Sequence, residues 1–143
     1  MSPVTCQNRC DEGHHPSRFA LCRPLLYKPA MRLRSDIYVS ALIRRVFAAG
    51  GFAAVERKGM DQAGAIFVRR RGRDGLETIY APAPQSLVDE DAAGDRLFEI
   101  RLDQVEAAEV DALISRELKW DSDLWVLEIE MDAVGDLLPL AKA

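Results

Sequence analysis

The chain has 143 residues, of which 48% are hydrophobic and 29% are charged, an ordinary composition for a soluble globular protein. A chain of this length is expected to form one domain whose core needs neither a metal nor a disulfide framework. It has no apolar run approaching about 18 residues, which argues against a membrane-spanning helix. Acidic residues and histidines stand where the apolar part of a secretory signal would lie. The expected location is the cytoplasm.

Charge is distributed unevenly along the chain. The net charge is −4, but residues 1–75 carry 14 basic and 6 acidic side chains, whereas residues 76–143 carry 5 and 17. This asymmetry indicates either a basic surface for an anionic partner or pairing of the two halves within one fold. Pairing within the fold is the simpler interpretation, because surface charge is usually only solvated.

The first thirty residues differ from the rest of the chain. They contain all three cysteines, both histidines and four of the seven prolines, and no apolar periodicity runs through them. This composition predicts a flexible N-terminal extension over residues 1–30 and a single α+β domain over residues 31–143. Met31 is a candidate for the true start of translation.

The cysteines and histidines of this extension have the number, but not the spacing, of a zinc site. Zinc takes four thiolate or imidazole ligands. The weak candidates are Cys6, Cys10, His14 and Cys22. Their spacing is not that of a zinc knuckle, and an odd number of cysteines does not close a disulfide framework. We therefore expect no metal and no other cofactor.

From residue 31 onward the pattern is regular. In DIYVSALIRRVFAAGG the apolar residues recur with helical spacing, Ser35 is the expected N-cap, and two glycines end the helix. Strands are expected at 52–58, 65–70 and 75–82, with a turn between the last two.

The second half of the domain predicts a fourth strand at 96–102, where apolar and polar residues alternate. Asp103 and Glu106 form a capping-box pattern for a second helix that ends near Leu118, and a last strand is expected at 124–131. Helices and strands do not alternate regularly, so the expected fold class is α+β. We expect a mostly antiparallel or mixed five-stranded sheet with two helices packed on one face.

The stretch KGMDQAGAIFV, residues 58–68, has two glycines spaced as in a phosphate-binding loop. However, Ala65 follows the second glycine where such a loop needs lysine, and a strand follows where it needs a helix. The glycines are therefore expected to end a hairpin loop between the first two strands.

Nucleophilic catalysis by a Ser–His or Cys–His pair is excluded for residues 31–143, because they contain no cysteine and no histidine. An enzyme using Asp or Glu chemistry is an alternative, although the sequence singles out no pair of carboxylates.

Aromatic residues favour a non-catalytic protein-binding or adaptor module, because tyrosine and tryptophan are enriched at interface hot spots. The expected partner is another protein, and the candidate contact residues are Tyr80, Gln85, Trp120 and Trp125.

A basic run offers a second alternative, a nucleic-acid-binding module. Its candidate residues are Arg69, Arg70, Arg71 and Arg73. The simpler interpretation of the run is that strand-end arginines pair with acidic neighbours.

Several stretches together resemble the small bacterial proteins of domain-of-unknown-function family 1491. They are MRLRSDIYVSALIRRVFAAGGFAAVERKG, AGAIFV, YAPAPQS and DSDLWVLEIE. The resemblance covers about residues 31–130. It implies a domain of about the length of residues 31–143, so residues 1–30 depart from the family pattern. It implies no activity.

Overall fold

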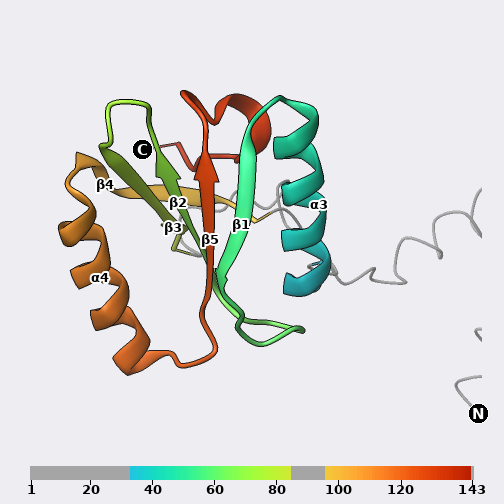
Figure 1. Cartoon of the computed structure of the whole chain (residues 1–143). Helices are drawn as coiled ribbons and strands as arrows, with labels where there is room; N and C mark the ends of the chain where they lie inside the picture. Colours follow the sequence, from blue (N-terminus) through green and yellow to red (C-terminus); the bar gives the residue numbers. More distant parts are fainter. Residues whose placement is uncertain (1–32, 85–95, 143) are drawn as a thin grey trace, which may run out of the picture. The chain divides into compact units, whose positions relative to one another are not determined.

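The computed structural model describes residues 33–84 and 96–142, which contain two α-helices, five β-strands and a short 3-10 helix (Figure 1). The first helix, α3 (Ser35–Ala48), buries Val39, Leu42 and Val46 along one stripe. It ends before Gly50, whose φ of 83° is a left-handed conformation that glycine adopts at little cost. The predicted extension and its four metal-ligand candidates lie outside the described residues.

The five strands form one open mixed sheet. They are β1 (Phe52–Arg57), β2 (Ile66–Arg71), β3 (Glu77–Pro82), β4 (Phe98–Val105) and β5 (Trp125–Glu130). Their order across the sheet is β1-β5-β2-β3-β4, with β5 parallel to β2 and every other pair antiparallel. The α+β class with a mixed five-stranded sheet is therefore confirmed.

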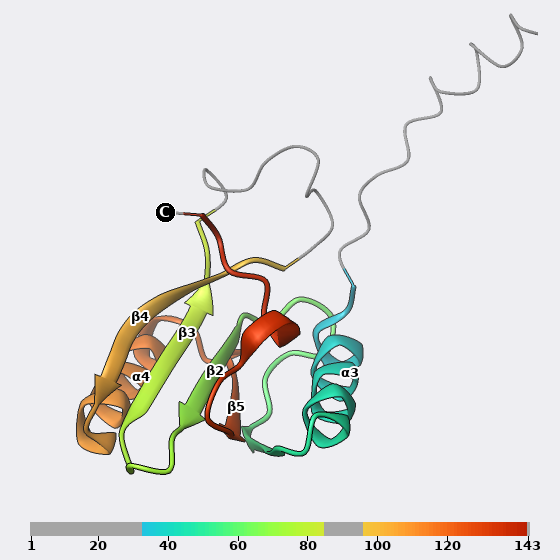
Figure 2. The ribbon, with the colours of Figure 1, turned by 90° about the horizontal axis from the view of Figure 1, so that it is seen from above.

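The prediction that both helices pack on one face is wrong. The second helix, α4 (Ala107–Trp120), packs with Phe67, Ile79 and Val126, whereas α3 packs with the oppositely directed Ile66 and Val68. The helices thus cover opposite faces of the sheet (Figure 2). In the structure, residues 66–69 of β2 are buried in succession, because a strand covered on both faces loses the alternation of buried and exposed residues. The corresponding signal in the sequence is the uninterrupted apolar run Ile66, Phe67 and Val68.

The predicted hairpin between the first two strands is also wrong. β5 lies between β1 and β2 and pairs with both. The connecting loop instead passes the start of β5, where Met60 N donates to Asp123 O at 2.9 Å and Trp125 Nε1 donates to Met60 O at 2.8 Å. The loop glycines are therefore needed for close approach to β5 rather than for a tight turn.

Both predicted helix caps are replaced by tertiary contacts. Ser35 is the first residue of α3 and is fully buried, with its hydroxyl donating to Gly64 O at 2.7 Å and accepting from Arg96 at 2.8 Å. Asp103 lies within β4, where it accepts a hydrogen bond from the Thr78 hydroxyl. Neither helix has a side-chain cap, so these polar residues tie distant segments together instead.

The 3-10 helix η4 (Gly135–Leu137) and the residues around it cover part of the α3 face, where Val134 and Leu138 join the core. Neither helix of the described part of the chain has the length and apolar character needed to cross a bilayer.

Candidate functional site

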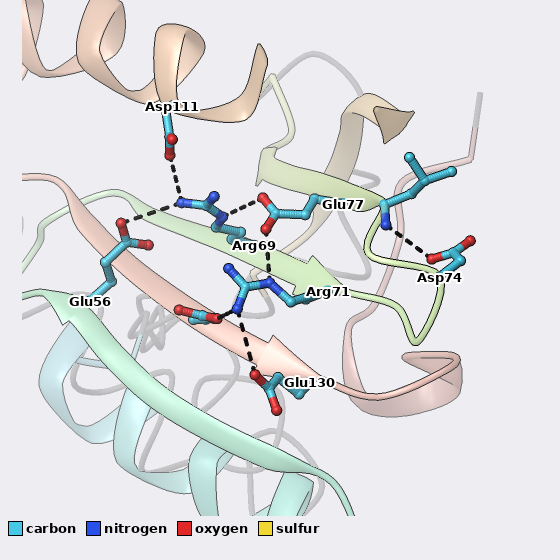
Figure 3. A network of polar contacts seen from close by, with 9 residues as sticks. Glu56, Arg69, Arg71, Asp74, Glu77, Asp111 and Glu130 are labelled. Carbon is cyan, nitrogen blue, oxygen red and sulfur yellow. Dashed lines mark hydrogen bonds and ion pairs between the residues drawn. The ribbon is translucent and has the colours of Figure 1, made fainter. Parts of the chain in front are cut away.

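The most elaborate polar cluster lies on the α4 side of the sheet and is built around Glu77 (Figure 3). Glu77 is completely buried, and each of its carboxylate oxygens meets one arginine. Arg69 Nε donates to Oε2 at 2.5 Å, and Arg71 Nε donates to Oε1 at 3.0 Å. Strand register explains this sharing, because Arg71 stands directly opposite Glu77 in the antiparallel pair.

Further carboxylates complete the cluster. Arg69 also binds Asp111 of α4 at 2.8 Å and Glu56 of β1 at 3.4 Å. Arg71 binds Glu128 at 3.0 Å and lies 3.7 Å from Glu130, both on β5. Two guanidinium groups thus join one helix and four strands. The arginine cluster is the name used below for the seven residues Glu56, Arg69, Arg71, Glu77, Asp111, Glu128 and Glu130.

The surrounding acids hold both arginines firmly protonated. Burial alone would lower the pKa of Arg69, but the hydrogen bond and charge of Glu77, followed by Asp111 and Glu56, raise the pKa above its ordinary value. The pKa of Arg71 is raised chiefly by its hydrogen bond to Glu77 and then by the charge of Glu128. A permanently charged, buried arginine serves to position strands and is poorly suited to proton transfer.

The basic run therefore pairs largely within the fold. Arg69 is 5% exposed, and Arg73 binds Asp132 at 3.2 Å. Arg70 donates to the Asp132 carbonyl and to the Thr78 hydroxyl. Arg69 is buried beneath its carboxylate partners, and Arg71, although 40% exposed, is held by Glu77 and Glu128. The interpretation that basic and acidic halves pair within one fold is confirmed for these residues.

A hollow of about 560 Å³ opens at the carboxyl ends of the parallel strands β2 and β5. Its walls include Gly50, Gly72, Arg73 and Asp132. Such strand ends are a common place for ligands in α/β proteins. Here the charged lining residues pair with one another, Arg73 with Asp132 and Arg71 with Glu130, so the charges of this hollow do not select a ligand of either sign.

The four residues predicted to contact a partner are not gathered on one surface. Tyr80 and Trp125 are 7% and 4% exposed and belong to the core, whereas Trp120, the last residue of α4, is 87% exposed. Gln85 lies outside the described residues. The structure thus leaves Trp120 as the accessible aromatic residue of this set.

The two tryptophans are expected to respond differently to a quencher. Trp125→Phe leaves the exposed Trp120, whose fluorescence should resemble that of tryptophan in water and be quenched strongly by acrylamide. Trp120→Phe leaves the buried Trp125, whose emission should be shifted to the blue and protected. Trp120→Phe should also change the free energy of unfolding by no more than about 0.5 kcal/mol. Equal quenching of both variants would contradict these positions.

Sequence reasoning missed an apolar surface at the free edge of β1. Phe52 and Val55 are 51% and 42% exposed, and Phe47 of α3, also half exposed, packs edge-on against Phe52 with ring centroids 5.7 Å apart. We call Phe47, Phe52, Val55 and the outer backbone of β1 the β1 edge surface. Its signal in the sequence is the uncharged stretch FAAV at the start of β1, which places apolar side chains on both faces of the strand.

In the described residues, the two edges of the sheet differ in protection. At β4, Phe98 N donates to Pro139 O at 2.9 Å and Ala141 N donates to Phe98 O at 2.8 Å, so the C-terminal segment covers the start of this strand. Farther along β4 the register shifts, and Gln104 has a φ of 50°. β1 pairs with β5 on its inner side, with a register shift between Val55 and Arg57. No described segment hydrogen-bonds to the outer side of β1.

Within residues 33–84 and 96–142, no three His, Cys, Asp or Glu side chains are arranged to hold a metal ion.

Comparison with known proteins identifies close structural relatives. A profile of the family described as "Protein of unknown function (DUF1491)" matches residues 33–139. A solution structure of a protein from A. tumefaciens is 60% identical, with a TM-score of 0.70, and the match covers 79% of this chain and 98% of that one. A crystal structure of a DUF1491 family protein from Caulobacter crescentus CB15 is 32% identical, with a TM-score of 0.64 and coverages of 78% and 100%. No match was found among curated proteins.

Proposed function

Because the chain belongs to the DUF1491 family, whose description names no activity, we propose a function from its surface: a small non-catalytic module that binds another protein through the β1 edge surface. One observation carries this proposal: the C-terminal segment covers the start of β4, whereas no described segment hydrogen-bonds to the outer side of β1. Exposed edge strands are templates for pairing, and proteins normally blunt them with charges, bulges or covering segments. In β1, the register shift between Val55 and Arg57 and the charges of Glu56 and Arg57 protect only the end of the strand. The apolar residues 52–55 before them have no covering segment among the described residues, and this stretch fits a strand that receives a partner.

The proposed occupant is an extended segment of another protein that adds a strand beside β1. Main-chain hydrogen bonds would supply much of the affinity in this mode of recognition, and alternate side chains would supply specificity. Phe52 and Phe47 offer an aromatic contact for an apolar side chain at one end of the strand.

The charges beside β1 favour a basic residue in the partner. On the α4 side, the arginine cluster has five carboxylates against two guanidinium groups, of which Arg69 is buried and Arg71 is 40% exposed. The rim of exposed groups therefore has an excess of negative charge. The cations at the end of β1 are already engaged, since Arg57 donates to Ser122 O and Lys58 binds Asp61. A segment with a basic side chain opposite Glu56 and an apolar one opposite Phe52 complements this surface.

The proposed interaction takes place in the cytoplasm, the location expected from the sequence. Fractionation of cells that produce the full chain tests the location.

A photo-crosslinking amino acid at position 52 of the full chain is expected to capture a different protein inside cells. The same amino acid at position 100 is the matched control, because Ile100 is 47% exposed and lies on the β4 edge. Val55→Lys should abolish crosslinking from position 52, because a lysine on an edge strand opposes pairing. Mass spectrometry of the adduct should identify an extended, basic segment.

Two results would contradict the proposed function. Equal products from positions 52 and 100 would show nonspecific contact. A product containing two copies of this chain and nothing else would show that the edge pairs with itself.

A further inference from the structure

A second hollow, of about 320 Å³, lies on the α3 side of the sheet, on the face opposite the arginine cluster. β2, β3 and β4 form one part of it, and the C-terminal segment around η4 forms the other. Its polar lining includes Arg70, Tyr80 and Gln104, and its apolar lining includes Val134, Leu138 and Leu140. The lining is about equally polar and apolar and also includes Asp132, and an apolar wall facing a few converging polar groups is a common feature of small-molecule sites.

Arg70 is the arginine of the basic run that lacks a carboxylate partner among the described residues. Arg69, Arg71 and Arg73 all form ion pairs, whereas Arg70 donates to the Asp132 carbonyl and to Thr78 Oγ1 at 3.1 Å. Its Nε is covered by the protein and has no hydrogen-bond partner. The Tyr80 hydroxyl also accepts from Arg70, so of the five N–H donors of the guanidinium one terminal N–H remains besides the covered Nε. Arg70 thus has no direct ion pair among the described residues, although the carboxylates of Asp103 and Asp132 lie nearby, and its remaining donor suits an anion.

Tyr80 adds a neutral donor beside Arg70. Burial raises the pKa of the Tyr80 phenol, and the nearby Arg70 opposes that shift only in part. The hydroxyl accordingly keeps its proton at neutral pH and can donate it in a hydrogen bond.

Gln104 brings a strained backbone to the rim of the same hollow. Its φ of 50° lies in the left-handed region, which residues other than glycine seldom adopt. Gln104 N donates to Thr78 Oγ1 at 3.3 Å, the same hydroxyl that accepts from Arg70. Strain of this kind clusters at ligand sites, and here it places an exposed amide beside the hollow.

We propose that this hollow binds a small aliphatic monocarboxylate, with its carboxylate on Arg70 and Tyr80 and its chain against Val134, Leu138 and Leu140. A single negative charge fits better than a double one, because Asp103 and Asp132 lie close to Arg70 and Tyr80 and would repel a dianion such as phosphate. The apolar wall selects a ligand with a hydrocarbon tail over a bare inorganic anion. The site is separate from the β1 edge surface and does not depend on the proposed protein partner.

The test is an NMR titration of the full, isotope-labelled chain with sodium hexanoate. We expect saturable shifts of the Tyr80, Gln104 and Leu138 amides and of the Arg70 side-chain Nε signal. Arg70→Gln should weaken hexanoate binding by about tenfold or more, because a charge-assisted hydrogen bond is lost. Tyr80→Phe should weaken it by a smaller factor. Arg116→Gln, at an exposed position on α4, is the matched control and should leave binding unchanged.

A second variant keeps the test decisive if Arg70→Gln unfolds. Leu140 is 46% exposed, so Leu140→Glu should fold and place a carboxylate at the mouth of the hollow, where it repels hexanoate. The proposal is overturned if hexanoate causes no saturable shifts, or if 1-hexanol binds equally well. Equal losses for Arg70→Gln and Arg116→Gln, or tighter binding of inorganic phosphate than of hexanoate, would also overturn it.

Discussion

Replacing Glu77 with glutamine is expected to lower the free energy of unfolding by about 3 kcal/mol, the low end of the cost of breaking a buried ion pair. The substitution removes the buried carboxylate that Arg69 and Arg71 share, while Arg69 keeps the more exposed carboxylates of Asp111 and Glu56. Arg69 is 5% exposed and cannot turn to water for compensation. The Glu77 carboxylate also holds Arg71, so its loss loosens β3 from β2 at two points. Domains are stable by about 5–15 kcal/mol in total, and a loss of this size would leave the fold marginal.

Urea unfolding of three variants measures this effect. Arg73→Gln breaks an ion pair whose arginine is 89% exposed and should cost no more than about 1 kcal/mol. The double variant Arg69→Met/Glu77→Leu removes both buried charges and should recover most of the loss, since apolar replacement of a buried pair is often neutral. A loss of less than about 1 kcal/mol for Glu77→Gln would contradict the buried ion pair.

Alanine at Gly59 or Gly64 is expected to destabilise the protein by about 2–4 kcal/mol, as severe overpacking does. A Cβ on Gly59 would lie 2.0 Å from the Asp123 carbonyl oxygen, and a Cβ on Gly64 would lie 2.5 Å from the same atom. The obstructing atom belongs to the backbone at the start of β5, so it cannot move aside by changing a rotamer. Each substitution would push the loop away from β5 and strain the hydrogen bond between Trp125 Nε1 and Met60 O.

Gly75→Ala is the control for Gly59→Ala and Gly64→Ala in the same denaturation experiment. Gly75 has a φ of 82°, and no atom lies within 4 Å of the position that an alanine Cβ would take there. Its cost of about 1 kcal/mol therefore comes from backbone conformation alone. We expect Gly59→Ala and Gly64→Ala to exceed it clearly. If all three lose the same amount, close approach to β5 is not what these glycines provide.

Local patterns in the sequence identified the elements well. The helix that ends at two glycines, the turn after β2 and the last strand all form close to their predicted positions. These features depend on side-chain periodicity and on glycine conformation, which act over a few residues. The predicted family follows from the same stretches and is confirmed over residues 33–139.

The predicted binding residues illustrate what local patterns leave open. Trp120 and Trp125 stand five residues apart, yet one is almost fully exposed and the other almost fully buried. Trp120 ends a helix on its solvent side, whereas Trp125 begins a strand that has neighbours on both sides. Aromatic residues serve cores and interfaces equally, so residue type alone does not separate the two roles.

The amino-acid sequence by itself determined the α+β class, the two helices, the five strands and the absence of histidine and cysteine from residues 31–143. Tertiary structure alone decided that β5 lies between β1 and β2, that the helices cover opposite faces, and that Arg69 is buried while Arg70 lacks an acidic partner among the described residues. The physical reason is the range of the interactions: periodicity and turn chemistry are local. Strand order, burial and charge pairing depend on residues far apart in the chain, which meet only when the sheet is complete.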